Sequence, residues 1–251
     1  MKHALIVGGS KGAGKVIAQM FKGKGYKVSI LSRSHPEDIN SDGYSENILF
    51  EKLDLEKPDA ESILFALSNV HKKNGPINYV VFSQRFKGKE DSLINEFNVT
   101  INSTKKIIDT MIAQKLFADG DKSVVAISSV GGKGILYQQP ESYAVGKAGI
   151  MALMNYYAVT LGPLGIRFNS VLPGMFIKPE SKAFYDASEE KKVLEGTAPL
   201  GRMTNTDDIA NVVEFFCNEK SYLVTGSQIV LDGGISLINQ ESLMMRKILN
   251  K

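Results

Sequence analysis

Short apolar runs alternate with longer amphipathic stretches along the chain of 251 residues. The apolar runs predict seven β-strands, at residues 3–7, 27–31, 48–53, 77–82, 123–128, 167–172 and 228–231. Apolar residues at helical spacing predict helices between them, at residues 14–23, 59–73, 93–116, 142–161 and 207–217. Strands that alternate with helices are typical of βαβ units. The pattern therefore predicts an α/β protein, with a doubly wound seven-stranded parallel sheet and helices on both of its faces.

No repeat, low-complexity segment or linker divides the chain, so we expect one domain over residues 1–251. Residues 175–202 are polar and rich in Lys and Glu, and they follow a predicted strand, as a candidate lid over a site would. Residues 237–251 form a C-terminal extension, which from residue 239 has the spacing of a short amphipathic helix. This helix either covers a neighbouring subunit or frays, and the sequence favours neither alternative.

Composition narrows the class of protein, with 43% hydrophobic and 23% charged residues as in ordinary globular domains. A net charge of +3, with no basic stripe carrying interleaved aromatic residues, argues against nucleic acid as a partner. Cys217 is the one cysteine and stands in an apolar run, so we expect a buried structural thiol. The three histidines are scattered, and no spacing suits a metal site.

The sequence also bears on where in the cell the protein is found. No stretch approaches the ~18 consecutive apolar residues of a membrane-spanning helix. The chain runs directly into a predicted strand at its start, which leaves no room for a signal peptide. We therefore expect a cytoplasmic protein that does not contact membranes.

A glycine-rich loop follows the first predicted strand and opens a helix. It has the spacing Gly-x-x-x-Gly-x-Gly, and it comprises Gly8, Ser10, Lys11, Gly12, Ala13 and Gly14 among its residues. Glycines permit a tight turn and a close backbone approach, and the helix N-terminus can bind a phosphate group. The loop predicts a dinucleotide site, and the alternative is a simple turn between strand and helix.

The end of the second predicted strand bears on which dinucleotide is bound. A site for NAD would have an acidic residue about 20 positions beyond the loop, to bind the ribose hydroxyls. This chain has Ser32 and Arg33 there. A guanidinium suits a 2′-phosphate, and Lys11 adds a second cation. We therefore predict NADP(H) as the cofactor, and the alternative is that both cations are simply solvated on the surface.

Tyr143 and Lys147 stand four residues apart in a predicted helix, so they share one of its faces. An ammonium beside a phenol stabilises the phenolate, which suits the tyrosine to general acid and base chemistry. With 9 tyrosines in the chain, about one such pair is expected by chance, so the pair alone is weak evidence. Its position strengthens it, because the glycine-rich loop opens the sequence and Ser129 lies shortly before the pair.

In their order along the chain, these motifs resemble the short-chain dehydrogenase/reductase family, in the single-domain branch that includes 3-oxoacyl-(acyl-carrier-protein) reductase. The likeness spans roughly residues 2–236. The family's landmarks fall on residues 7–14, Asp54-Leu55, Asn98, Ser129, the pair Tyr143 and Lys147, Pro173-Gly174, and the segments 199–203, 225–226 and 232–234. The resemblance implies a Rossmann-like fold and hydride transfer between a nicotinamide and a carbonyl or secondary-alcohol substrate.

The resemblance also implies roles for single residues. Tyr143 donates a proton to the developing alkoxide or removes it in reverse, and Lys147 supports it and holds the nicotinamide ribose. Ser129 hydrogen-bonds the carbonyl oxygen, and Asn98 fixes the helix from which a water relays protons. Further cofactor contacts are implied for Asp54, Leu55, Ser83, Tyr143, Pro173, Gly174 and Phe176.

Several of these assignments have rivals within the chain. Tyr143 is alternatively a packed aromatic residue, and Ser129 alternatively satisfies backbone groups at a strand end. Asn98 is alternatively an ordinary turn residue, and Asn102 is its nearest rival. Ser128 is the alternative catalytic serine, although it lies even further from Tyr143 than Ser129 does.

The chain departs from the family in three places. Phe82-Ser83-Gln84-Arg85 stands where the family has Asn-Asn-Ala-Gly, so Gln84 and Arg85 either contact the substrate or replace structural residues. Lys178 stands where a threonine usually follows Pro-Gly. The interval from Ser129 to Tyr143 is one residue longer than usual, which predicts a small insertion around residues 137–140.

We therefore expect an NADP(H)-dependent oxidoreductase acting on a small carbonyl compound or alcohol. The alternative is a sensor or scaffold protein that binds NADP(H) without turnover, which the altered segment 82–85 suggests and the intact Tyr143 and Lys147 oppose. Apolar residues lie nearly all round the predicted helix 142–161, so a second protomer could cover it. Family members commonly pair through this helix, and we expect a homodimer or homotetramer.

Overall fold

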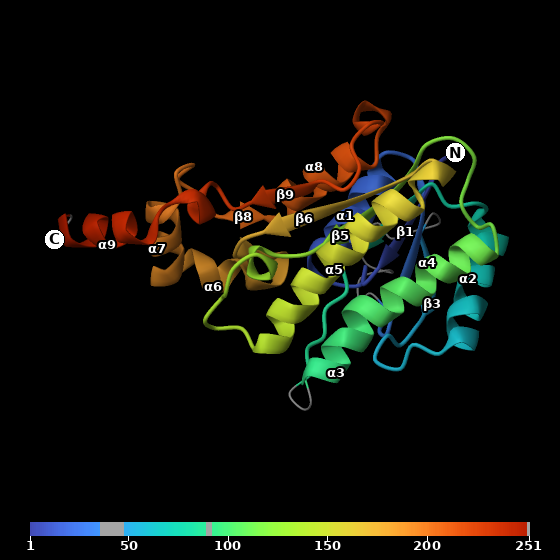
Figure 1. The fold of residues 1–251 in the computed structure, drawn as a ribbon, viewed down its shortest axis with the longest axis horizontal. Coiled ribbons are helices and arrows are strands. Elements are labelled where there is room, and N and C mark those ends of the chain that lie inside the picture. The colour runs from blue at the N-terminus through green and yellow to red at the C-terminus, as the bar shows by residue number, and fades with distance from the viewer. Residues whose placement is uncertain (36–47, 89–91, 250–251) are drawn as a thin grey trace.

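The centre of the molecule is a parallel sheet of seven strands in the order β3-β2-β1-β4-β5-β6-β9. The structure is a computed structural model and describes residues 1–35, 48–88 and 92–249. The sheet comprises β1 (His3–Val7), β2 (Lys27–Ser32), β3 (Ile48–Lys52), β4 (Tyr79–Phe82), β5 (Lys122–Ile127), β6 (Ile166–Pro173) and β9 (Gln228–Leu231). Figure 1 shows the strands running between layers of helices, as the alternating pattern predicts. The predicted α/β fold with its seven-stranded parallel sheet is confirmed.

Helices pack against both faces of this sheet. One face is covered by α1 (Gly12–Gly23) and α8 (Thr206–Phe216), and the other by α2 (Ala60–Asn74), α4 (Ser103–Ala113) and α5 (Glu141–Thr160). Figure 1 shows α4 and α5 side by side over one face, with α1 behind the strands. Each helix therefore buries one apolar side against the sheet.

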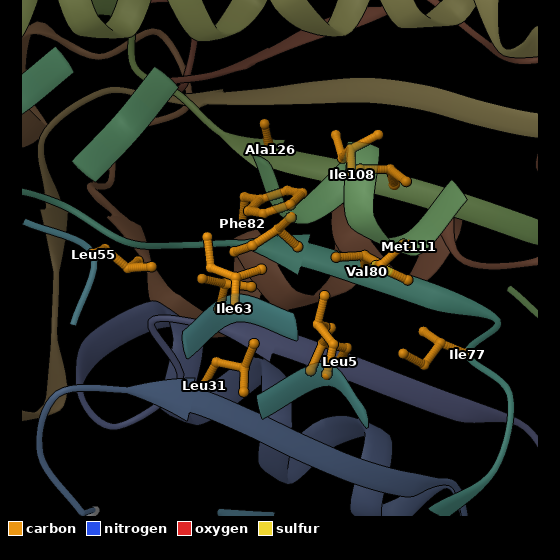
Figure 2. Packing of buried hydrophobic residues seen from close by; sticks show 14 of the residues in the cluster. Leu5, Leu31, Leu55, Ile63, Ile77, Val80, Phe82, Ile108, Met111 and Ala126 are labelled. Carbon is orange, nitrogen blue, oxygen red and sulfur yellow. The ribbon is translucent and has the colours of Figure 1, made fainter. Parts of the chain in front are cut away.

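Alternate residues of the central strand β1 belong to two separate hydrophobic cores, one on each face of the sheet. Ala4 and Ile6 of β1 belong to the cluster beneath α1 and α8, whereas Leu5 and Val7 belong to the cluster beneath α2, α4 and α5. Figure 2 shows the second cluster, in which Leu5 lies near Ile63 of α2. Because β1 is buried on both faces, its residues 4–7 form an unbroken apolar run.

The strand order reverses between β1 and β4. β1 pairs with β2 on one side and with β4 on the other, and all of these strands run parallel. In open α/β sheets, ligands bind in the crevice beyond the carboxyl ends of the strands at such a reversal. The glycine-rich loop follows β1 there, and the altered segment that begins at Phe82 follows β4.

The predicted helix 93–116 consists of three parts. α3 (Ser92–Glu96) leads into a π-helical turn (Phe97–Asn102), and α4 follows it directly. Within the turn, the Ser103 backbone N–H donates to the Asn98 carbonyl five residues earlier. Single π-helical turns between stretches of α-helix occur often at functional sites.

Two segments lie outside the sheet layers. The candidate lid carries β7 (Phe176–Ile177), α6 (Lys182–Asp186) and α7 (Glu189–Thr197), and β7 pairs with β8 (Thr204–Asn205). The C-terminal helix α9 (Gln240–Leu249) extends away from the body of the molecule in Figure 1, and residues 250–251 of the predicted extension lie outside the described residues. Within the described ranges, no helix is long and apolar enough to cross a membrane.

Candidate active site

Two adjoining cavities open at the crevice beside β1 and β4. The first has a volume of about 320 Å³, and the second a volume of about 460 Å³. Both are lined by Lys11, Ser83, Gln84, Arg85 and Lys87. Because they share these five residues, the two cavities form one elongated cleft along the carboxyl ends of the strands.

Most of the predicted cofactor residues line this cleft. The first cavity includes Gly8, Ser10, Ser32, Arg33 and Leu55, in addition to Lys11 and Ser83. The second includes Gly12, Ala13, Tyr143, Lys147 and Phe176. The predicted residues that line neither cavity are Gly14, Asp54, Asn98, Ser129, Pro173 and Gly174.

The backbone of the glycine-rich loop leaves no room for side chains at two positions. Gly8 has a φ of +81°, and a Cβ added there would lie 2.6 Å from the Gln84 backbone nitrogen. A Cβ added at Gly14 would lie 2.3 Å from the Gly8 carbonyl oxygen. Glycine is therefore required at both positions, and the loop folds tightly between β1 and the start of α1.

An acidic side chain from the lid reaches the N-terminus of α1. The Gly12 backbone N–H donates to Glu180 Oε1 over 2.9 Å. Burial acts to raise the pKa of Glu180 and is the largest single effect. The Gly12 hydrogen bond, the backbone N–H of Glu180 itself and the charges of Lys178 and Lys15 together outweigh it, so the pKa is lowered. The amide therefore already serves as an anion site, as expected at a helix N-terminus.

Arg33, which is predicted to bind a 2′-phosphate, is paired with a carboxylate in the structure. Arg33 forms an ion pair with Glu56, and both residues line the first cavity. Ser32 Oγ donates to the carbonyl oxygen of Ser34 over 2.8 Å. Asp54 accepts a hydrogen bond from the Glu56 backbone N–H, which orders the turn that carries Glu56. The end of β2 therefore presents a cation and a carboxylate together.

Tyr143 and Lys147 meet on one face of α5, as their spacing predicts. The Lys147 ammonium lies 5.7 Å from the centroid of the Tyr143 ring and donates to the Ile127 carbonyl over 3.1 Å. Only 5% of Lys147 is exposed. Burial lowers its pKa to about 8, an effect that Glu96 opposes and Arg85 reinforces.

The structure separates the two candidate serines. Ser129 Oγ accepts from the Gly131 backbone N–H over 3.0 Å and donates to the Pro173 carbonyl over a long 3.5 Å. Ser128 lines the second cavity, but its hydroxyl donates to the Lys147 carbonyl over 2.7 Å. Ser128 is therefore committed to a strong backbone contact, whereas the proton of Ser129 is weakly held.

Asn98 and its rival Asn102 belong to a single hydrogen-bonded pair. Asn102 Nδ2 donates to Asn98 Oδ1 over 3.2 Å, across the π-helical turn. The turn also contains Thr100, whose hydroxyl donates to the carboxylate of Glu96 over 2.5 Å. Glu96 is buried against α5, since a Cβ added at Gly146 would lie 2.7 Å from its side chain.

Gln84 and Arg85 in the altered segment have different environments. Gln84 Nε2 donates to Thr104 over 2.9 Å, which is a structural contact, but its buried Oε1 has no hydrogen-bond partner among the described residues. Arg85 Nη2 donates to Gln139 Oε1 over 2.9 Å, and its guanidinium lies 5.0 Å from the Tyr143 ring centroid. Arg85 is therefore part of the site.

Sequence reasoning missed four charged residues of this region. Glu56, Lys87, Glu96 and Glu180 all line cavities at the site. None belongs to a motif. Glu56, Lys87 and Glu180 lie in connecting segments whose path the sequence does not specify, whereas Glu96 ends α3, inside the predicted helix 93–116. Within the described residues, no group of three or more His, Cys, Asp or Glu side chains could hold a metal.

The buried ammonium of Lys147 makes stability depend on pH. Its ordinary pKa is 10.5 and its folded pKa is about 8, so between these values the unfolded chain holds the extra proton and stability rises with pH. We expect Lys147→Met to unfold at a higher urea concentration than the wild type at pH 7. This advantage should shrink as the pH rises from about 8 to 10.5, and a difference independent of pH would contradict the assignment.

Comparisons with known proteins agree with this geometry. A family model described as enoyl-(acyl carrier protein) reductase matches residues 7–236. The L-rhamnose-1-dehydrogenase of Scheffersomyces stipitis is 30% identical over 255 residues, covering 93% of this chain and 95% of that protein. The 3-oxoacyl-(acyl-carrier-protein) reductase FabG of Thermotoga maritima is 29% identical over 250 residues, covering 93% and 97%.

Solved structures share the fold over the same extent. A variant of ElxO with NADPH bound superimposes with a TM-score of 0.81 at 26% identity, covering 94% of this chain and 99% of that one. A short-chain dehydrogenase family protein from Francisella tularensis gives a TM-score of 0.78 at 24% identity, with coverage of 95% and 100%. The chain therefore belongs to the short-chain dehydrogenase/reductase family of oxidoreductases.

Proposed function

We propose that this protein is an NADP(H)-dependent oxidoreductase that interconverts a carbonyl compound and a secondary alcohol, with Tyr143 as the general acid and base. The observation that carries the proposal is the lining of the second cavity. The glycine-rich loop contributes Gly12 and Ala13 to it, and α5 contributes Tyr143 and Lys147. A dinucleotide on the loop would therefore share its cavity with the proton-transfer pair.

The residues of the cleft fit a dinucleotide. Gly8 and Gly14 keep the loop free of side chains, and Gly12 offers a backbone N–H that already binds a carboxylate. The buried Oε1 of Gln84 is an acceptor that no described residue satisfies, which suits a hydroxyl or amide donor of the ligand. A nicotinamide bound here would supply or accept the hydride.

Binding of a diphosphate at the start of α1 requires Glu180 to leave. Its carboxylate holds the Gly12 amide, and like charges would repel at this position. Lys178, two residues earlier in the chain, has its side chain beside Gly12 and would stay as a cation for the phosphate. The diphosphate would therefore replace the Glu180 carboxylate as the anion at the N-terminus of α1.

Proton transfer is assigned to residues on α5 and at the end of β5. Tyr143 would donate its phenol proton to the carbonyl oxygen during reduction, and the nearby Lys147 ammonium would stabilise the phenolate left behind. Ser129 would turn its hydroxyl from the weak Pro173 contact toward the developing negative charge. Asn98 would keep the π-helical turn beside Glu96 in register.

The preference for NADP(H) rests on the cations at the first cavity. Arg33 and Lys11 line it, and no acidic residue occupies the strand-end position where NAD enzymes hold the ribose hydroxyls. Glu56 opposes this preference, because its ion pair occupies the Arg33 guanidinium. A 2′-phosphate would compete for Arg33 with the advantage of a larger charge. Relatives differ here, since one L-rhamnose 1-dehydrogenase is named for both NAD⁺ and NADP⁺.

Calorimetric titration with NADPH and NADH tests this assignment. We expect the wild type to bind NADPH about tenfold or more tightly than NADH, since a charge-assisted hydrogen bond contributes about that factor. Arg33→Asp should reverse the order, and Lys72→Asp on the exposed side of α2 is the charge-matched control. An unchanged preference in Arg33→Asp would refute the role of Arg33, and failure of both cofactors to bind would refute the reductase proposal.

We also propose that two protomers pair through α5. Its outward face carries Val145, Tyr156 and Val159, which are 55%, 62% and 77% exposed. Val145, Ala152 and Val159 recur every seven residues and so form one stripe along the helix. An apolar groove of about 110 Å³ beside this stripe is lined in part by Leu93 and Phe97. A second α5 would cover both features, as the expected homodimer or homotetramer requires.

A further inference from the structure

A third cavity lies on the side of Tyr143 away from the glycine-rich loop. Its volume is about 460 Å³, and its lining consists of residues 85–88, Glu96, 138–140, Ser142 and Tyr143. It shares Arg85, Lys87 and Tyr143 with the second cavity but includes no residue of the loop 8–14. If the cofactor binds along the loop, this third cavity is the space left for the substrate.

Arg85 stands at the junction of the three cavities. Its guanidinium lies 5.0 Å from the centroid of the Tyr143 ring. One small molecule is therefore long enough to contact both the guanidinium and the phenol oxygen. Among the described side chains, the guanidinium donates to the neutral amide oxygen of Gln139, which also lines the third cavity. Within the described residues, no carboxylate forms an ion pair with Arg85 or Lys87, although Arg33 and Arg167 both have acidic partners.

Among the described residues that line the second cavity beside Tyr143, cations outnumber carboxylates. Arg85, Lys87, Lys147 and Lys178 all line the second cavity. Burial lowers the pKa of Lys178, and the charges of Lys87 and Arg85 lower it further, so these groups repel one another across the cleft. The two nearby carboxylates already have hydrogen-bond donors, Glu96 from Thr100 and Glu180 from Gly12.

The anionic cofactor would neutralise only part of this excess of positive charge. The side chain of Lys178 lies beside Gly12, where a diphosphate is expected. Arg85 and Lys87 continue into the third cavity, beyond Tyr143. A guanidinium pairs with a carboxylate or phosphate through two parallel hydrogen bonds.

We propose that the carbonyl substrate carries an acidic group, a carboxylate or a phosphate, which the Arg85 guanidinium binds in the third cavity while the carbonyl faces Tyr143. Lys87 adds attraction at the cavity wall, and Gln139 holds the guanidinium in place before the substrate enters. This inference rests on the proposed oxidoreductase function. It adds the class of substrate, which the family resemblance does not specify.

Matched pairs of ligands test the proposal by binding, without need for turnover. Acetoacetate and ethyl acetoacetate differ in one carboxylate, and dihydroxyacetone phosphate and dihydroxyacetone differ in one phosphate. Each is titrated by calorimetry into the protein saturated with NADP⁺. We expect at least one acidic compound to bind about tenfold or more tightly than its neutral partner. The pair with the larger ratio identifies carboxylate or phosphate as the group recognised.

Arg85→Gln should remove this discrimination, while Lys72→Gln on the exposed side of α2 should keep it. Equal binding of the acidic and neutral partners in the wild type would overturn the proposal, as would full discrimination in Arg85→Gln. The oxidoreductase function has a separate readout, the oxidation of NADPH in the presence of a ketone. Turnover of neutral ketones without discrimination would therefore refute the acidic substrate alone.

Discussion

Replacement of Tyr143 by phenylalanine is expected to lower kcat by about 10²–10⁴-fold, the usual contribution of a positioned acid or base. The change removes one phenol oxygen and keeps the ring. The ring contacts that remain include the Arg85 guanidinium at 5.0 Å and the Lys147 ammonium at 5.7 Å. Cofactor affinity should therefore stay within about twofold of the wild type. Steady-state rates of NADPH oxidation and a calorimetric titration with NADPH measure the two quantities.

Tyr222→Phe provides the control for this experiment. It makes the same chemical change at a side chain that is 70% exposed and lies outside both the cleft and the proposed pairing face of α5. We expect its kcat to be unchanged. If Tyr143→Phe retained the wild-type kcat, the proton would have to come from another group in the cavity, and the assignment of Tyr143 would fail. Loss of NADPH binding in Tyr143→Phe would instead assign the phenol to the cofactor.

The fold could be predicted to the extent that burial leaves a mark on the sequence. β1 and β4 are buried on both faces. Residues 4–7 of β1 and the whole of β4 are unbroken apolar runs, so the existence and parallel arrangement of these strands follow from pattern alone. The π-helical turn at Phe97–Asn102 leaves no such mark. It moves the backbone hydrogen bond of Ser103 to a carbonyl one residue further back, and the apolar spacing changes too little to signal this.

The site could be predicted where motifs lie at strand ends and helix starts. A parallel α/β sheet brings the carboxyl ends of β1, β4 and β5 together, so the order of motifs along the chain is enough to assign Gly8, Ser83 and Tyr143 to one cleft. Side-chain pairs could not be predicted. Glu180 binds Gly12 across 168 positions of sequence, because a lid segment folds back over the loop. Such contacts depend on the path of loops, on which hydrophobic periodicity is silent.

The side-chain contacts of Asp121, in the body of the fold, likewise could not be predicted from the sequence. In the sequence, the segment 119–121 is typical of a turn and nothing more. In the structure, the Asp121 side chain is 7% exposed and accepts hydrogen bonds from Arg167 at 3.0 Å and from Tyr79 at 2.7 Å. Arg167 is likewise 7% exposed and also donates to Ser221. Burial and this carboxylate raise the pKa of Tyr79, so the phenol remains a donor to Asp121.

This network joins β4, the turn before β5, β6 and the turn after α8, so its loss should affect stability more than any surface change. Asp121→Ala leaves the Arg167 guanidinium buried without a counter-charge, and we expect the free energy of unfolding to fall by about 3–5 kcal/mol. Urea denaturation monitored by circular dichroism measures this loss. Asp119→Ala, at an exposed carboxylate two residues away, should change it by less than about 0.5 kcal/mol.

A double variant separates the buried charge from the turn itself. Asp121→Ala combined with Arg167→Met removes the unpaired guanidinium and fills part of its volume with apolar atoms. Since replacing a buried ion pair by apolar groups is often close to neutral, the double variant should be more stable than Asp121→Ala alone. If the double variant is no more stable than Asp121→Ala, the carboxylate acts through the turn and Tyr79 rather than through Arg167. A single-variant loss below about 1 kcal/mol would mean that water replaces the carboxylate beside Arg167 and that the pair is not isolated from solvent.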